Sequence, residues 1–373
     1  MKSIVSEALA RHEEAKAREE TAPARPHVES GDDDEIQKIV DSLNVSIKIV
    51  GCGGGGSNTI NRCSEAGVQG AQLCAVNTDA KHLLSVHAPK KILIGKRLTK
   101  GLGAGALPEV GEQAARENEE EIRQFVQGSH IVFVTAGMGG GTGTGAAQYV
   151  ARLGKEAQSL VMGVVTMPFK AEGRIRMENA EAGLDRLRHF CDTTIVIYND
   201  RLLELVPRLP IDAAFKVADE ILMQSIKGMT EIITKPGLVN LDYADLMTIM
   251  KGGGVAMIGL GESDADRDRI EYAVNEALES PLLGEVDLTH ARGVLVRVVG
   301  GPDLTISEAQ KAAEIIGTKV NPQARIIWGC SVEPELERSV HVLLCITGVK
   351  SKSILGKEFS HAPVAAADVD EVR

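Results

Sequence analysis

A glycine loop at residues 137–145 contains the residues of this sequence best suited to binding a phosphate group. Two threonines, Thr142 and Thr144, alternate with its glycines, and the loop lies between an apolar run and a segment with helical spacing. Glycines have no Cβ, so backbone N–H groups can converge on an anion, and a helix N-terminus adds its dipole. No lysine follows as in a P-loop. We therefore predict a phosphate cradle whose ligand charge is met by backbone dipoles, a metal ion or a cation from elsewhere.

Two more glycine loops, at residues 51–58 and 100–105, follow the apolar runs 45–50 and 91–94. A flexible linker or a tight turn is the alternative, but linkers are usually longer, rich in serine and not placed between a strand and a helix. The first loop also fits a dinucleotide-binding unit with Asp79 as its acidic residue, which leaves the other two loops without a role. Because a triphosphate needs more donors than a pyrophosphate, three loops in one sheet predict one extended triphosphate site.

A purine site is suggested by Phe215 and Asp219, which lie four residues apart and so on one face of a long expected helix. The ring can stack on a base. The carboxylate can accept from the N1 and N2 hydrogens of guanine, whereas adenine presents one donor beside an acceptor. The alternative is a core phenylalanine next to a surface aspartate, which is the more common situation for two such residues considered alone.

Asp242 and Asp245 are the carboxylates best suited to act on a water molecule. They lie three residues apart where a helix is expected to begin, and their spacing alone favours the alternative of helix capping. However, they lie on the far side of the long helix from the glycine loops, so one subunit could hardly bring both together. A head-to-tail stack of subunits could do so, and such a contact produces an open filament.

The elements that must position these residues alternate between strand and helix. Strands are expected at 45–50, 73–76, 91–94, 131–134, 160–166 and 194–197, and helices up to 65 and at 108–127, 146–157, 175–189 and 210–234. Near-continuous apolar strands are typical of a parallel sheet buried on both faces, and ligands bind at the carboxyl ends of such strands. A second region has strands at 255–259, 292–299, 325–329 and 340–346 and helices at 265–279 and 306–318, which predicts a smaller α+β domain.

Composition sets limits on the class of protein. The chain has 373 residues and a net charge of −11, so it is long enough for two cores, and its acidity argues against a nucleic-acid partner. The six cysteines form no C-x-x-C pair and are expected to be buried thiols in a reducing cytosol. No signal peptide and no run of ~20 apolar residues is found. We expect a cytoplasmic protein without direct membrane insertion.

Between about residues 46 and 348, the sequence closely resembles the FtsZ family of tubulin-like cell-division GTPases, and it is more similar to the archaeal members than to the bacterial ones. The resemblance is carried by residues 139–145 (GGGTGTG, the tubulin-family signature), 77–79 (NTD), 101–105 (GLGAG), 172–174 (EGR) and 240–245 (NLDYAD, similar to the family's synergy loop). It implies a tubulin/FtsZ-like α/β fold with a parallel-sheet nucleotide-binding domain, a long central helix and a second, smaller α+β domain. The expected segments are a flexible extension (1–37), a GTP-binding domain (38–209), the central helix (210–235), an activation domain (236–350) and a flexible tail (351–373).

The resemblance also implies roles for individual residues. Glu172 would bond the ribose, Arg176 would lie beside the nucleotide, and Asn199 would lie near the base. Catalysis would use Asn240, Asp242 and Asp245 on the γ-phosphate of the neighbouring subunit. With the loops, the nucleotide-binding set is Gly54, Gly55, Gly56, Ser57, Asn58, Asn77, Asp79, Gly103, Ala104, Gly105, Gly139, Gly140, Gly141, Thr142, Gly143, Thr144, Gly145, Glu172, Arg176, Asn199, Phe215 and Asp219.

The implied ligands are GTP and GDP, with Mg²⁺ bridging phosphate oxygens and no protein ligand assigned to it. The implied partners are further copies of the chain in a head-to-tail polymer at the midcell division ring, and a membrane-tethering division protein that binds the tail. Two alternatives remain open from the sequence. One is a slowly hydrolysing tubulin-like scaffold or cell-shape paralogue, against which the intact Asp242 and Asp245 argue. The other is a dinucleotide-dependent oxidoreductase.

Overall fold

The computed structural model describes residues 45–205, 211–235, 243–284 and 286–351. Asn240, Asp242 and the expected extension at 1–37 lie outside these ranges, as does all but the first residue of the expected tail. Among the described residues, none of the helices is long and apolar enough to span a membrane.

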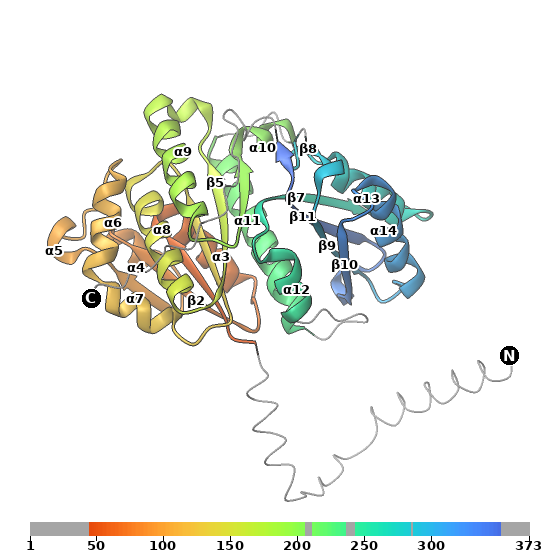
Figure 1. The fold of residues 1–373 in the computed structure, drawn as a ribbon, viewed down its shortest axis with the longest axis horizontal. Coiled ribbons are helices and arrows are strands. Elements are labelled where there is room, and N and C mark those ends of the chain that lie inside the picture. The colour runs from red at the N-terminus through yellow and green to blue at the C-terminus, as the bar shows by residue number, and fades with distance from the viewer. Residues whose placement is uncertain (1–44, 206–210, 236–242, 285, 352–373) are drawn as a thin grey trace, which may run out of the picture. The chain divides into compact units, whose positions relative to one another are not determined.

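Six parallel strands form the first part of one sheet (Figure 1). They are β1 (Ile47–Cys52), β2 (Ala71–Asn77), β3 (Lys90–Leu93), β4 (Ile131–Gly137), β5 (Leu160–Met167) and β6 (Thr193–Tyr198), in the order β6-β5-β4-β1-β2-β3. β1 and β5 are buried along their whole length. This burial confirms the two-sided parallel sheet predicted from the apolar runs.

The helices of this part connect successive strands. They are α3 (Gly53–Glu65), α4 (Ala80–Ser85), α5 (Lys96–Thr99), α6 (Pro108–Glu117), α7 (Glu119–Val126), α8 (Gly141–Glu156), α9 (Arg174–Arg188) and α10 (Asn199–Leu205), with a 3₁₀ turn η1 (Lys170–Glu172). The prediction of one helix at 108–127 is wrong, because two helices meet at Asn118 with φ −113° and ψ 28°. The Asn118 Oδ1 atom accepts from the Gly95 N–H at 3.0 Å, a side-chain bond to backbone that competes with helix continuation.

The second part of the chain extends the same sheet. Its elements are β7 (Gly254–Ser263), α13 (Arg269–Glu279), β8 (Val286–Asp287), η2 (Leu288–His290), β9 (Gly293–Gly300), α14 (Ile306–Lys319), β10 (Arg325–Val332), η3 (Pro334–Leu336), β11 (Val340–Thr347) and β12 (Lys350–Ser351). The strand order β10-β9-β11-β7 continues onto β6, since residues 254–256 of β7 pair in parallel with residues 193–195 of β6. The sequence did not predict this short pairing, and the domain boundaries stay a prediction.

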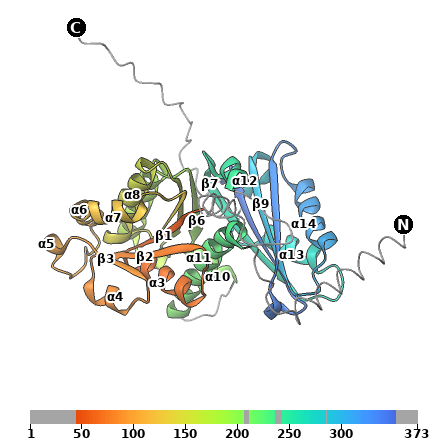
Figure 2. The ribbon, with the colours of Figure 1, turned by 90° about the horizontal axis from the view of Figure 1, so that it is seen from below.

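Helix α11 (Ile211–Thr234) lies between the two parts of the sheet in both views (Figures 1 and 2). Its predicted apolar stripe is confirmed, because Ala214, Ala218, Leu222 and Ile226 are buried. Ala218, Leu222 and Ile226 share one apolar core with α3 and with α12 (Tyr243–Met250) on one face of the sheet. A second core, under α6 to α9 and under α13 and α14, covers the other face.

Candidate nucleotide site

A pocket of about 390 Å³ gathers residues from all three glycine loops, from the ends of β4, β5 and β6, and from α11. The expected residues that line it are Gly54, Gly55, Asn58, Gly105, Gly140, Gly141, Thr142, Gly143, Glu172, Arg176, Asn199, Phe215 and Asp219. They come from segments more than 160 residues apart in the sequence. The pocket therefore brings together the three glycine loops and the residues that the sequence analysis expects to contact a purine.

The three glycine loops touch one another through their backbones. Gly53 has φ +71°, and a Cβ there would lie 2.6 Å from the Gly143 N atom. A Cβ on Gly141 would lie 2.5 Å from the Gly105 carbonyl oxygen. Because no larger residue fits between the loops, the glycines let three chain segments form one continuous wall of the pocket.

Two helices begin at this wall. α3 starts at Gly53 and α8 starts at Gly141, and neither has a side chain that caps its N-terminus. Helix N-terminal N–H groups without a capping side chain are donors suited to phosphate oxygens, and both dipoles favour a negative ligand. The Thr142 hydroxyl lies at the same wall, bonded to the Thr78 hydroxyl at 2.6 Å.

The end of the pocket formed by α11 fits a flat, polar ring. Phe215 is 39% exposed, and its ring packs edge to face against Phe169 with the centroids 5.1 Å apart. Asn199 is 4% exposed and its Oδ1 atom has no hydrogen-bond partner in the protein. An orphaned buried polar atom beside an exposed aromatic face is expected where a ligand completes the hydrogen bonding.

Asp219 supplies the negative charge at this end. Burial raises the pKa of Asp219 to about 6, although attraction to Arg62 and a hydrogen bond from Asn58 oppose the rise. A partly desolvated carboxylate forms stronger hydrogen bonds to N–H donors than a solvated one does. The arrangement suits the paired N1 and N2 hydrogens of guanine.

Glu172 and Arg176 form a pair at the rim. The Glu172 Oε1 atom accepts from the Phe169 N–H at 2.8 Å, and its Oε2 atom lies 3.0 Å from the Arg176 Nε atom. Since the Glu172 side chain is only 12% exposed, its carboxylate is held in one orientation. A fixed carboxylate on the lining of this pocket is a suitable acceptor for ribose hydroxyls.

Several expected residues are not among those that line the pocket. These are Gly56, Ser57, Asn77, Asp79, Gly103, Ala104, Gly139, Thr144 and Gly145. The Thr144 hydroxyl accepts from the Gly139 N–H at 2.8 Å, and a Cβ on Gly145 would lie 2.0 Å from the Pro108 carbonyl oxygen. These residues shape the loops, and their contact with a nucleotide stays a prediction.

The predicted set of nucleotide-binding residues left out five lining residues, Gly137, Met138, Thr166, Pro168 and Ala218, although Gly137 and Met138 lie in the predicted glycine loop at 137–145. Four of them lie at the carboxyl ends of β4 and β5 or just beyond. The rule that ligands bind at these ends would have found them.

Asp245 lies far from this pocket. It is in the first turn of α12, whose Tyr243 hydroxyl donates to the His130 carbonyl oxygen at 3.4 Å. His130 directly precedes β4, whereas the central glycine loop follows β4. Seven strand residues separate the two ends by roughly 20 Å. Within one chain, Asp245 and the phosphate cradle therefore lie at opposite edges of the sheet.

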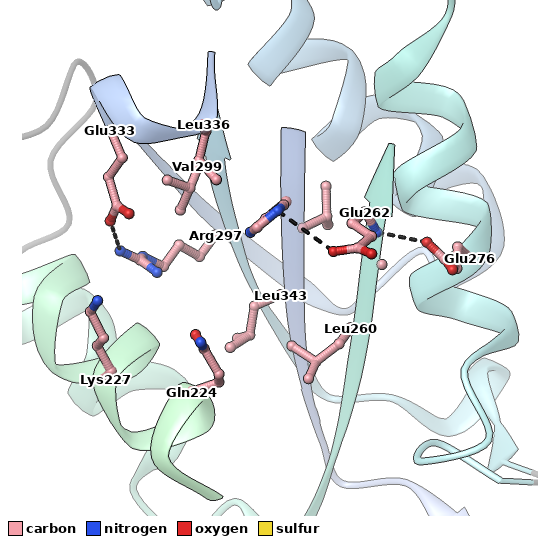
Figure 3. A pocket seen from close by; sticks show the side chains of 13 residues that line it. Gln224, Lys227, Leu260, Glu262, Glu276, Arg297, Val299, Glu333, Leu336 and Leu343 are labelled. Carbon is pink, nitrogen blue, oxygen red and sulfur yellow. Dashed lines mark hydrogen bonds and ion pairs between the residues drawn. The ribbon is translucent and has the colours of Figure 1, made fainter. Parts of the chain in front are cut away.

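A second pocket, of about 480 Å³, lies between α11 and the strands β7, β9 and β11 (Figure 3). It is lined by Gln224 and Lys227 of α11 and by charged residues such as Arg297, which pairs with Glu333 at 3.5 Å. No glycine loop reaches it. The smaller pocket is therefore the candidate site, because residues of all three glycine loops line it.

The fold and the site together define a nucleotide-binding protein of the tubulin-like GTPase class. Residues 46–207 match the GTPase domain of the Tubulin/FtsZ family, and residues 254–350 match the C-terminal domain of the FtsZ family. The chain belongs to the FtsZ family of cell-division proteins and is a GTPase.

Individual relatives agree with this assignment. Cell division protein FtsZ 1 of Archaeoglobus fulgidus is 56% identical over 96% of each chain, and FtsZ of Haloferax mediterranei is 54% identical over 87% of this chain and 86% of its own. The structure of an empty FtsZ dimer from M. jannaschii aligns with a TM-score of 0.82 at 46% identity, covering 90% of this chain and 99% of that one. CetZ1 of Haloferax volcanii, at 23% identity and a TM-score of 0.72, shares the fold. The oxidoreductase and scaffold alternatives are not favoured.

Proposed function

We propose that this protein recognises guanine through Phe215, Asp219 and Asn199 and hydrolyses GTP where two copies stack head to tail. The observation that supports a shared site is the separation of Asp245 from the phosphate cradle by the length of β4. A stacked copy would present the N-terminus of its α12 to the open pocket. The dimer described for the M. jannaschii relative is consistent with such self-association.

The proposed chemistry needs little from the protein beyond position and charge. The glycine loops would hold the phosphates with backbone N–H groups, and the carboxylates at 242 and 245 of the next copy would orient or deprotonate the attacking water. Asn240 would act on the γ-phosphate together with them. Hydrolysis would therefore depend on assembly, because neither edge of the sheet is complete alone.

Mg²⁺ fits this site as an ion bound mainly by the nucleotide. The described residues contain no cluster of three or more His, Cys, Asp or Glu side chains that could hold a metal. The Thr142 hydroxyl, at the wall formed by the glycine loops, is already bonded to Thr78. When bound, the ion would offset the charge on the phosphate oxygens, while the chain would contribute backbone donors.

The test is the rate of phosphate release per subunit with GTP and Mg²⁺ over a range of protein concentrations. We expect the specific activity to rise above a threshold concentration. Asp245→Ala should bind GDP normally and lose turnover, while Thr248→Ala, one turn further along α12 and exposed, should keep both. A specific activity that is flat with concentration would refute the shared site.

A mixing experiment adds a sharper test. Asp245→Ala keeps an intact nucleotide pocket, and Asp219→Asn keeps an intact Asp245 at the N-terminus of α12. If the site is shared, each contact combines the pocket of one copy with Asp245 of the next copy. In an equal mixture, roughly a quarter of the contacts pair the intact pocket of one variant with the intact Asp245 of the other, so that fraction of the contacts should be active. Two inactive variants that stay inactive when mixed would contradict the proposal.

We also propose that the polymer forms the midcell division ring and attaches to the membrane through a division protein that binds the segment after residue 351. Both proposals follow from family membership. Imaging a fluorescent fusion of the chain with and without residues 352–373 tests them, since the ring should be lost or detached from the membrane without that segment.

A further inference from the structure

His82 lies next to the nucleotide pocket but not on its wall, and it joins two residues from separate loops. Its Nδ1 atom is 3.2 Å from the Asn77 Nδ2 atom, and its Nε2 atom is 3.0 Å from the Asn58 Oδ1 atom. The backbone N–H of His82 donates to the Asp79 side chain at 3.0 Å, which fixes the start of α4. The imidazole is therefore held between the end of β2 and helix α3.

The hydrogen-bond network assigns the protonation of this imidazole. The Asn77 Oδ1 atom accepts from the Thr78 and Asp79 N–H groups at 2.9 and 3.3 Å, so its Nδ2 atom faces His82. An amide nitrogen only donates, so His82 Nδ1 must accept. The ring hydrogen is then on Nε2, where it donates to the Asn58 Oδ1 atom.

Asn58 connects the His82 imidazole to the end of the pocket where Asp219 lies. With its Oδ1 atom bonded to His82, its Nδ2 atom is left to donate to the Asp219 carboxylate, which lines the same pocket and whose rise in pKa is opposed by hydrogen bonding to Asn58. Asn58 is exposed in the pocket, so nothing in its packing prevents its amide from turning over. A turned amide would present its oxygen to the carboxylate, and that contact is repulsive.

We propose that His82 is a positioning residue for guanine recognition, acting through Asn58 to fix the rotation of the Asp219 carboxylate. Neither His82 nor Asn77 lines the pocket, so the effect reaches the base only through this chain of hydrogen bonds. The inference rests on the proposed reading of guanine by Asp219. A carboxylate with fixed rotation can accept from N1 and N2 together, whereas a freely turning one accepts well from only one donor.

Comparing GDP with IDP isolates this effect, because inosine lacks the N2 amino group and needs only one acceptor. Two substitutions of similar size distinguish the roles of the two ring nitrogens of His82. The amide nitrogen of His82→Gln can reach the place of Nε2 and donate to Asn58, while the shorter His82→Asn reaches only the place of Nδ1. We expect His82→Asn to weaken GDP binding roughly tenfold and IDP binding much less, as for loss of one hydrogen bond to a charged group.

The expected pattern has three further parts. His82→Gln should restore most of the preference for GDP over IDP. For GTP hydrolysis, His82→Asn should raise KM and leave kcat nearly unchanged, because the phosphates lie at the other end of the pocket. Asp219→Asn, as the reference, should abolish the preference for GDP over IDP.

Each contrary result has a distinct meaning. If Asp219→Asn removes the preference and His82→Asn keeps it, the role of His82 is refuted while base recognition by Asp219 stands. If Asp219→Asn keeps the preference, recognition by Asp219 is refuted, and the role of His82 with it. If both His82 variants weaken GDP and IDP binding equally, His82 only supports the fold around α4 and the proposal is wrong.

Discussion

Asp219→Asn should make the nucleotide-free protein more stable at neutral pH while it removes guanine recognition. Burial raises the pKa of this carboxyl from 3.8 to about 6. At about 1.36 kcal/mol for each unit of pKa, the difference of roughly 2.2 corresponds to about 3 kcal/mol. Asparagine has nearly the same shape, carries no charge and can still accept from Asn58.

The sign of the effect follows from proton binding. Since the pKa of Asp219 is raised in the folded protein, the folded protein binds this proton more tightly than the unfolded chain does. The stabilising contribution is complete below pH 3.8 and is lost as the pH rises through about 6. Above pH 6 the ionised carboxylate therefore costs about 3 kcal/mol of unfolding free energy, and the neutral variant avoids this cost.

Urea unfolding of the nucleotide-free proteins at pH 8, 6 and 4.5 measures the effect. We expect Asp219→Asn to exceed the parent by up to about 3 kcal/mol at pH 8, by slightly less at pH 6 and by only about 1 kcal/mol at pH 4.5. GDP affinity at pH 8 should fall by about a hundredfold, since two charge-assisted hydrogen bonds are weakened.

Glu220→Gln is the matched control, because it removes a carboxylate from the next position of α11. Glu220 is 44% exposed and pairs with Arg62 at 3.0 Å, so its loss should give no stabilisation and at most about 1 kcal/mol of destabilisation. If Asp219→Asn is no more stable than the parent at pH 8, or if its advantage is the same at pH 4.5, the desolvation argument is refuted.

Two further predictions concern residues that the structure shows to be constrained. Gly53→Ala should lower the melting temperature and abolish GDP binding, because Gly53 has φ +71° and a new Cβ would lie 2.6 Å from the Gly143 N atom, whereas a Cβ on Gly54 would meet no atom within 4 Å. An unchanged melting temperature for Gly53→Ala would contradict the close packing of the loops. Arg297→Ala should lower the unfolding free energy in urea by about 3 kcal/mol, because the Arg297 Nη2 atom bonds the buried Glu231 carboxylate at 2.8 Å. Adding Glu231→Ala should recover part of the loss, and a double variant less stable than Arg297→Ala would argue against a paired charge.

Much of this fold could be predicted from sequence because its signals are local. Strands buried on both faces are apolar along their whole length, and two of the glycine loops stand directly after such strands, β1 and β4, while the third follows β3 and the short helix α5. The carboxyl ends of parallel strands share one edge, so the loops had to converge. The apolar stripe of α11 was predictable for the same reason, since its period shows in the sequence alone.

Other features depend on contacts that the sequence does not reveal. The break at Asn118 exists because its side chain bonds the backbone of Gly95, 23 residues away. The sheet continues from β6 to β7 through residues 193–195 and 254–256 only, too short a pairing to show as a pattern. Thr144 and Gly145 turn inward because of neighbours on α6 and in the loop itself, and alternation along the loop does not tell which face meets the ligand.

Asp219 shows where sequence reasoning reaches its limit within the site. Its spacing from Phe215 was enough to propose a purine contact, because that relation needs only the period of a helix. Its raised pKa depends on burial against segments far away in the chain, and its orientation depends on Asn58 and His82 from two other elements. A carboxylate whose burial cost outweighs the attraction to Arg62 and the hydrogen bond from Asn58 is poorly satisfied until a ligand with two N–H groups arrives. The energetic argument for guanine therefore comes from the folded structure, whereas the residue that makes the contact could be identified from the sequence.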